Sequence, residues 1–201
     1  MADTATLVYA PLGGAGEIGM NCYLYGFGPA RDRKWIMVDC GIGFGDEGST
    51  PGVEIMVPDV AFAEELGDRL LGIFVTHAHE DHVGAVGYLH ERLRAPVYAT
   101  RFTAAVARRK MQEEGRSPKA VKTVDFGQPV EVGPFTVEYL RITHSIPEAG
   151  SLAIRTPKGT VLHSGDFKLD SDPLLGPAAN LAPFEALGRE GVLAMACDST
   201  N

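Results

Sequence analysis

Cysteine is scarce in this sequence, with three residues among 201, Cys22, Cys40 and Cys197. They show no C-x-x-C spacing, and an odd count argues against a disulfide framework. A zinc site built from cysteines is excluded on the same ground, because it needs paired cysteine ligands. All three residues lie in apolar, strand-like surroundings, so we expect buried free thiols.

Long hydrophobic runs are also missing. No apolar stretch approaches the roughly 18 to 20 residues that span a bilayer. Residues 1–4 carry neither a basic region nor the start of a signal-peptide core. With 45% hydrophobic and 22% charged residues, the composition is that of an ordinary globular domain with a full core. We therefore expect a cytoplasmic protein with no membrane association.

Positive charge is in short supply, since 18 lysines and arginines face 26 acidic residues and the net charge is −8. Proteins that bind nucleic acids usually carry a basic footprint, so charge alone points away from RNA. Bound metal ions would offset part of this negative charge locally. One basic cluster, Arg108-Arg109-Lys110, lies in a helix expected over residues 102–114. Such a cluster is usually a solvated helix face, and RNA contact there is the less favoured alternative.

What the sequence does hold is a dense group of potential metal ligands, Thr76-His77-Ala78-His79-Glu80-Asp81-His82. The apolar run before it, residues 70–75, is short enough to be a buried strand. Residues 83–94 repeat their apolar positions as one face of a helix. Imidazoles and carboxylates in a strand-to-helix turn can face one cavity, and they suit zinc and related divalent ions. A solvated, His-rich surface turn is the less favoured alternative.

Three further polar residues follow predicted strands. Asp39 ends an apolar strand, and we expect it to orient metal ligands through hydrogen bonds, with a turn-capping role as the alternative. His144 and Asp166 lie in loops at the ends of later strands. His90 and His163 lack a comparable context, and we interpret them as surface or packing residues.

A glycine-rich segment, residues 14–19, matches the G-x-G-x-x-G dinucleotide fingerprint, and Asp39 follows about twenty residues later. A helix must follow the third glycine of that fingerprint. Here residues 21–25 are β-prone, and Gly26, Gly28 and Pro29 would interrupt a helix. We therefore interpret the glycines as a tight turn between two strands near the metal cavity.

The seven-residue motif resembles H-x-H-x-D-H, the signature of the metallo-β-lactamase superfamily. Further motifs narrow the resemblance to the amino-terminal portion of the bacterial ribonuclease J family, in the β-CASP group, along essentially the whole chain. These motifs are residues 10–19, 37–41, 143–147, 163–168 and 198–201. The resemblance implies an α/β (α+β) fold, the αββα sandwich, with residues 1–201 forming the amino-terminal part of a metallo-β-lactamase domain. The predicted order of strands and helices fits this architecture.

Carried over residue by residue, the family pattern implies a centre with two zinc ions, with manganese as the alternative metal. The implied ligands are His77, His79 and His144 on one ion, Asp81 and His82 on the other, and Asp166 between them. A hydroxide held between the ions would attack the RNA phosphodiester. Asp81 is also the implied catalytic residue, since it could orient or deprotonate that water.

The same resemblance implies that family members continue past Asn201 into a β-CASP domain and a returning segment that adds a last histidine ligand. We therefore expect this chain to hold one zinc firmly and a second weakly, with feeble nuclease activity or none. An inactive metal-binding fragment is thus one alternative.

The implied function is 5′-to-3′ exoribonuclease and endoribonuclease activity in RNA processing and decay. Full-length family members are expected to form homo-oligomers. A thioesterase and a DNA or transfer-RNA nuclease of the same superfamily remain alternatives. The motifs at residues 145–147 and 198–201 favour ribonuclease J over them.

Overall fold

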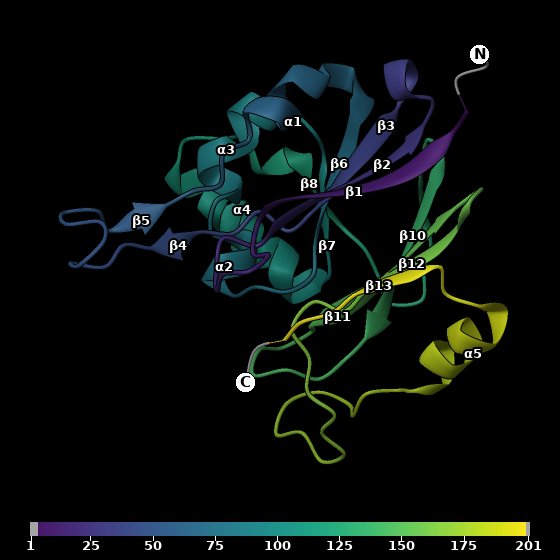
Figure 1. The fold of residues 1–201 in the computed structure, drawn as a ribbon. Coiled ribbons are helices and arrows are strands. Elements are labelled where there is room, and N and C mark those ends of the chain that lie inside the picture. Colours follow the sequence, from purple (N-terminus) through teal and green to yellow (C-terminus); the bar gives the residue numbers. More distant parts are fainter. Residues whose placement is uncertain (1–3, 200–201) are drawn as a thin grey trace.

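Two β-sheets pack face to face between layers of helices in the computed structural model, which describes residues 4–199 (Figure 1). The first sheet contains, in spatial order, β1 (Thr6–Gly13), β2 (Cys22–Gly28), β3 (Lys34–Val38), β6 (Leu70–Val75), β7 (Val97–Ala99) and β8 (Val121–Thr123). The second contains β13 (Ala194–Ala196), β12 (Gly159–His163), β11 (Gly150–Thr156), β10 (Phe135–Arg141) and β9 (Val130–Val132). A hairpin of β4 (Gly43–Phe44) and β5 (Ile55–Met56) projects from the body of the molecule (Figure 1).

Helices cover the outer face of each sheet. The first sheet is covered by α1 (Ala61–Leu66), α3 (Val86–Leu93) and α4 (Arg101–Glu113), and the second by α5 (Ala182–Glu190). A short helix, α2 (Glu80–Val83), follows β6, and 3-10 turns lie at Ala30–Asp32, Gly67–Arg69 and Pro118–Ala120. This layering confirms the expected αββα sandwich. Within residues 4–199, no helix is both long enough and apolar enough to cross a membrane.

Among residues 4–199, the buried apolar side chains form three clusters, one between each pair of adjacent layers. Strand β6 contributes to two of them, because Ile73 and Val75 face the helices whereas Phe74 faces the second sheet. A strand that is buried on both faces needs no alternation of polar and apolar residues. This explains why residues 70–75 read as a continuous apolar run.

Tyr139 of β10 connects the two sheets at the point where β6 ends. Its fully buried hydroxyl lies 3.2 Å from the carbonyl oxygen of Val75 and 2.8 Å from that of Tyr98, and it donates toward them. A buried hydroxyl without a partner would be costly, so these contacts favour one spacing of the sheets. The His-rich turn begins directly after this contact, at Thr76.

The helix expected over residues 83–94 is in fact two helices. Helix α2 begins at Glu80, inside the His-rich motif, and α3 begins at Val86. The break has a backbone cause, because the N–H of Ala85 donates to the carbonyl of Cys40 and the N–H of Cys40 donates to the carbonyl of His82. Apolar periodicity cannot report such a contact with a distant segment.

The expectation of three buried thiols is correct for Cys22 and Cys40 but wrong for Cys197, which is exposed. Cys197 follows β13, which lies at the edge of its sheet and exposes Ala194 and Met195. An apolar local sequence predicts a strand, but burial depends on which residues pack over that strand.

The basic cluster Arg108-Arg109-Lys110 on α4 is engaged within the protein. The partners of its three side chains are, in order, the carbonyl oxygen of Val121, the carboxylate of Glu113 and the carboxylate of Glu80. These contacts favour a structural role for the cluster over RNA contact. The bond from Lys110 also connects α4 to α2, the helix that carries the second half of the motif.

Candidate metal centre

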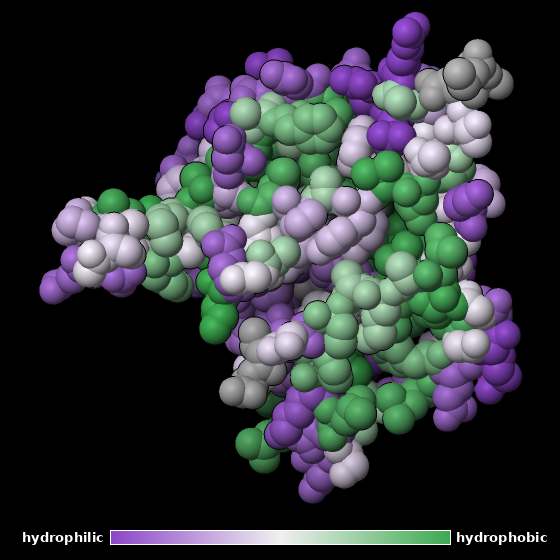
Figure 2. Space-filling model, in the orientation of Figure 1, coloured by the Kyte–Doolittle hydropathy of each residue, from purple (hydrophilic) through white to green (hydrophobic). Residues whose placement is uncertain are grey.

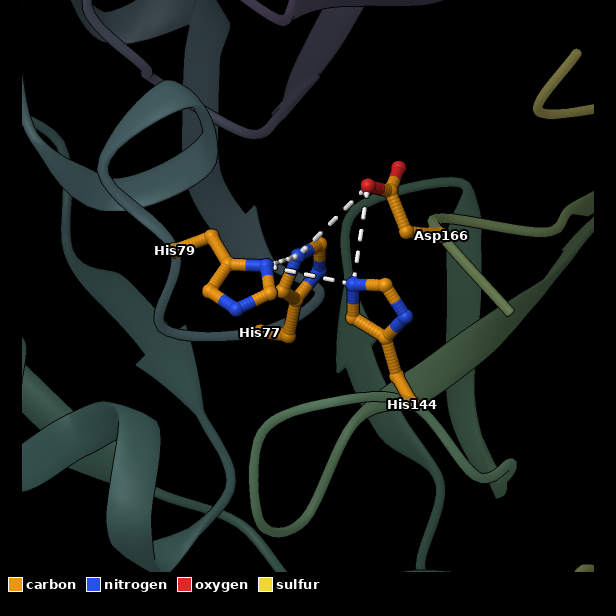
Figure 3. Close-up of side chains that lie close together, drawn as sticks. All are labelled: His77, His79, His144 and Asp166. Carbon is orange, nitrogen blue, oxygen red and sulfur yellow. Dashed lines mark hydrogen bonds and ion pairs between the residues drawn. The ribbon is translucent and has the colours of Figure 1, made fainter. Parts of the chain in front are cut away.

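Three strands end at the same edge of the sandwich and bring the predicted ligands together. His77 and His79 follow β6, His144 follows β10 and Asp166 follows β12. Strands β10 and β12 both run antiparallel to β11, so the loops that follow them leave the sheet on the same side. Figure 3 shows the four side chains directed toward one another. Asp81 and His82 approach from α2.

Three imidazole nitrogens and one carboxylate oxygen form the first donor group. Nδ1 of His79 lies 3.1 Å from Nε2 of His77 and 3.1 Å from Nε2 of His144. Oδ2 of Asp166 lies 3.7 Å from Nε2 of His144 and 3.9 Å from Nε2 of His77. Ligands at about 2.0–2.1 Å from a tetrahedral ion are separated by roughly 3.3 Å, so this spacing could surround one ion.

Asp81, His82 and Asp166 form the second donor group. Nε2 of His82 lies 3.5 Å from Oδ2 of Asp81 and 3.2 Å from Oδ1 of Asp166. Within each group, the donor atoms all lie within 4.8 Å of one another. Asp166 faces the first group with Oδ2 and the second with Oδ1, so the two groups are neighbours that share one carboxylate.

In His77 and His79, the ring nitrogen that faces away from the first group has a partner of its own. The Thr76 hydroxyl lies 3.0 Å from Nδ1 of His77, and the Ser145 hydroxyl lies 3.4 Å from Nε2 of His79. Partners of this kind fix the orientation of a ring and its tautomer. They leave the inward nitrogen of each ring free to act as a donor atom.

Asp39 forms hydrogen bonds that hold His82 of the second group in place. Its side chain is fully buried and its backbone is left-handed, with φ of 59°. The carboxylate accepts the backbone N–H of Thr76 at 2.7 Å, and its Oδ2 lies 2.8 Å from Nδ1 of His82. The hydrogen bonds expected of this residue are therefore present, and the one to His82 keeps Nε2 directed toward Asp166.

Burial and charge act in opposite directions on the histidines. Burial lowers the pKa of His82, but the carboxylates of Asp39 and Asp166 outweigh this effect and raise the pKa to about 10. Burial and the neighbouring imidazoles hold the pKa of His77 far below its ordinary value, and burial also lowers the pKa of His144. The surroundings of His82 therefore favour positive charge, whereas His77 and His144 are neutral imidazoles at neutral pH.

Two residues that the sequence reasoning did not single out lie against the second group. Nδ2 of Asn21 donates to Oδ2 of Asp81 at 3.2 Å, and the Tyr23 hydroxyl donates to Oδ1 of Asn21 at 2.7 Å. The available signal was two polar residues spaced two apart at the start of an apolar strand, which places both on one face. This spacing predicts that Asn21 and Tyr23 lie on the same face of the strand, but it does not predict which residues that face contacts.

A cavity of about 490 Å³ opens beside the second group and is lined in part by loop 14–19. The loop joins β1 to β2, and Gly14, Gly16 and Gly19 have φ angles of 78°, 80° and 87°. The prediction of a tight turn near the cavity is thus confirmed. Because a strand follows the loop where the dinucleotide fingerprint requires a helix, that fingerprint is excluded.

The walls of this cavity are acidic. Its carboxylates belong to Glu17, Asp81, Asp166 and Asp198, and within residues 4–199 no lysine or arginine lines it. A phosphate anion would be repelled there unless cations offset the charge. A second cavity, of about 600 Å³, is lined by His144 and carries Lys168 on its wall.

The remaining histidines have structural partners. His163 is buried, the Tyr25 hydroxyl lies 2.9 Å from its Nδ1, and burial lowers its pKa to about 4. A ring nitrogen of His90 lies 3.1 Å from the carbonyl oxygen of Ala95. These contacts agree with the packing role expected for both, although His163 also lines the acidic cavity. The last two residues of the motif at 198–201 lie outside the described residues.

Known proteins resemble this chain along most of its length. The profile of the metallo-beta-lactamase superfamily matches residues 15–191. The chain is 50% identical over 203 residues to a protein named Ribonuclease J from Sinorhizobium meliloti, and the match covers all of this chain and 36% of that protein. A Ribonuclease J from Helicobacter pylori is 38% identical over 199 residues, with 98% of this chain and 28% of that protein covered.

Another Ribonuclease J, from Thermus thermophilus, is 39% identical and is covered to 34% of its length. The chain thus spans about a third of the length of these relatives. Among solved structures, a protein of unknown function from Enterococcus faecalis has a TM-score of 0.58 at 20% identity, with 83% of this chain and 44% of that chain covered. That likeness supports the fold alone.

Proposed function

Because the chain belongs to the metallo-β-lactamase superfamily, we propose that its two donor groups hold a pair of divalent metal ions and that the protein hydrolyses RNA. The observation that carries this proposal is the sharing of Asp166 between two donor groups at one strand edge. A two-metal site needs two ions a few ångströms apart, and a shared carboxylate supplies that arrangement.

The donor chemistry fits such ions. The first group offers three imidazoles and one carboxylate, which is a set typical of zinc. The second group offers one imidazole and two carboxylates, a harder set that would also suit manganese. When bound, the ions would lower the pKa of water and polarise the phosphoryl group.

The residues of the chain have distinct roles in this proposal. His77, His79 and His144 would hold one ion, and Asp81 and His82 the other. Asp81 is 32% exposed at the rim of the acidic cavity, so its free oxygen could also orient the attacking water and accept its proton. Asp166 would fix the spacing between the two halves of the site.

The substrate is inferred from the relatives, which carry the name Ribonuclease J. RNA would enter as a polyanion, and the ions would offset the carboxylates of the acidic cavity. Lys168, which lines the second cavity and is 69% exposed, would exchange its contact with the Asp170 carboxylate at 3.1 Å for a phosphate of the backbone. We infer 5′-to-3′ exonuclease and endonuclease activity in the cytoplasm, where free thiols such as Cys22 and Cys40 are stable. Homo-oligomer formation belongs to the same proposal.

Removal of the metal is the direct test of this function. In a longer protein that contains this chain, treatment with a chelator is expected to lower the rate of RNA cleavage about a thousandfold or more, because the ions supply several kcal/mol of transition-state stabilisation. Zinc or manganese should restore the rate. The 201-residue chain alone is expected to cleave RNA feebly or not at all. The assay compares 5′-labelled single-stranded RNA, DNA of the same sequence and a thioester, with the 201-residue chain and with any longer protein that contains it.

RNA cleavage that survives chelation would contradict the proposal. Faster cleavage of DNA or of the thioester than of RNA would assign the site to a different hydrolase of the superfamily. Light scattering on the same samples measures the oligomeric state and so tests the proposed formation of a homo-oligomer.

A further inference from the structure

We propose that Asn21 is a positioning residue for the second donor group and that Tyr23 sets the orientation of its amide. Asn21 would hold the Asp81 carboxylate in the direction that lets it share an ion with His82 and Asp166. This inference rests on the proposed function, since it concerns how one half of the two-metal site is kept in shape.

Asn21 contacts the second group through both its side chain and its backbone. Nδ2 donates to Oδ2 of Asp81 at 3.2 Å and lies 3.0 Å from Nε2 of His82. The backbone N–H of Asn21 donates to the carbonyl oxygen of Asp81 at 2.9 Å. The carbonyl of Asn21 in turn accepts the N–H of Gly41 at 3.0 Å. The amide is thus fixed next to the donor atoms of both Asp81 and His82.

The loop that precedes Asn21 determines its position beside Asp81 and His82. Gly19 and Met20 both have left-handed backbone conformations, with φ of 87° and 48°. The N–H of Met20 donates to the carbonyl of Ile42 at 3.0 Å, which holds the loop against the segment after Asp39. A left-handed methionine is uncommon, and its presence here shows that the surrounding contacts outweigh its strain.

Tyr23 decides which end of the amide faces Asp81. Its hydroxyl donates to Oδ1 of Asn21 at 2.7 Å, so the oxygen is directed to Tyr23 and the NH₂ group to the carboxylate. The Tyr23 ring is stacked on Tyr9, with centroids 6.0 Å apart and an angle of 17° between the ring planes. A side chain at Gly14 would overlap both the Tyr23 hydroxyl and Oδ1 of Asn21, so glycine makes room for this pair.

Asp81 needs such support because it is only partly enclosed. Its side chain is 32% exposed, and within residues 4–199 the hydrogen-bond donor that reaches its carboxylate is Asn21. Without that donor, the carboxylate could rotate into the cavity and away from Nε2 of His82. By contrast, the first group has its own outer partners, Thr76 and Ser145, which do not touch Asn21.

The test is a titration of the metal-stripped chain with cobalt(II), followed by ligand-field absorption and calorimetry, for Asn21→Ala and Tyr23→Phe. Loss of an outer-shell partner typically costs about 10–100-fold in metal affinity, which is the weakening expected for the second ion in Asn21→Ala. Tyr23→Phe should weaken the same step by a smaller factor. Tyr9→Phe is the matched control, because it removes a hydroxyl from the adjacent stacked ring and leaves Asn21 and its partners in place.

The first binding step and the thermal midpoint of the metal-free chain should not change in any variant, since a general loss of structure would affect both. Equal affinities for the second ion in Asn21→Ala and in the unsubstituted chain would overturn the positioning role while leaving the two-metal proposal intact. Uptake of only one ion by the unsubstituted chain at saturating cobalt would overturn the two-metal proposal, and the role of Asn21 with it.

Discussion

Replacement of Asp166 by alanine is expected to abolish uptake of the second ion, to weaken the first and, in a longer protein that contains this chain, to lower RNA cleavage about a thousandfold or more. The reason is geometric, because within residues 4–199 Asp166 is the one residue that belongs to both donor groups. Its Oδ1 lies 3.2 Å from Nε2 of His82 and its Oδ2 lies 3.7 Å from Nε2 of His144. Zinc content and the initial rate on labelled RNA measure the two effects.

Asp172→Ala is the matched control for this change. Asp172 is an exposed aspartate a few residues along the same segment, and its backbone N–H, not its carboxylate, donates to Oδ1 of Asp170. It should leave the metal content and the rate unchanged. Two ions bound normally by Asp166→Ala, or full activity in that variant, would contradict the shared-carboxylate arrangement.

Gly41→Ala is expected to have the largest effect on stability, about 3 kcal/mol or more. A methyl group at Gly41 would overlap the backbone carbonyl of Asp81 and press on the N–H of His82. These are backbone atoms at the start of α2, so they cannot move aside as the end of a flexible side chain can. The substitution would therefore either displace α2, which carries Asp81 and His82, or unfold part of the domain. Urea denaturation of the metal-free chain measures the loss.

The control for Gly41→Ala is Gly188→Ala on α5. No atom lies within 4 Å of a methyl group added at Gly188, which is exposed within the helix. That substitution should be neutral or raise the free energy of unfolding by up to about 1 kcal/mol through helix propensity. A Gly41→Ala chain as stable as Gly188→Ala would show that α2 is not clamped against the segment after Asp39.

Much of the fold could be predicted from the sequence because its central elements have strong local patterns. The apolar run at residues 70–75 and the ligand-rich turn after it predicted the strand, the turn and the approach of Asp81 from a helix. The helix expected over residues 102–114 was also predicted to within one residue at each end. Each of these depends on residues that are close together in the chain.

The features that local patterns missed depend on contacts between distant segments. The break between α2 and α3 results from hydrogen bonds to Cys40, and Cys197 is exposed because its strand lies at a sheet edge. Local patterns also gave no indication of the β4–β5 hairpin, whose two-residue strands are too short to show a period. Phe44 and Ile55 of this hairpin are both exposed, and Figure 2 shows apolar surface where the hairpin leaves the body of the molecule.

The residues of the candidate site differ in how well the sequence predicts them. His77, His79, Asp81 and His82 form a pattern that indicates metal binding by itself. His144 and Asp166 were predicted only through their family-like contexts, because a single histidine or aspartate in a loop has no distinguishing pattern. Asn21 was not predicted at all, since its importance comes from Asp81, which lies 60 residues away in the sequence.

The measurement that bears most directly on the metal centre is zinc content per chain after extensive dialysis, for the unsubstituted chain and for His144→Ala. Four donors converge in the first group and three in the second, so about one zinc should remain bound and a second should be lost readily. His144→Ala should lose the retained ion. No zinc in the unsubstituted chain, or the same zinc content in both proteins, would contradict the first site. Two firmly held ions would contradict the expectation that the first group binds its ion more tightly than the second.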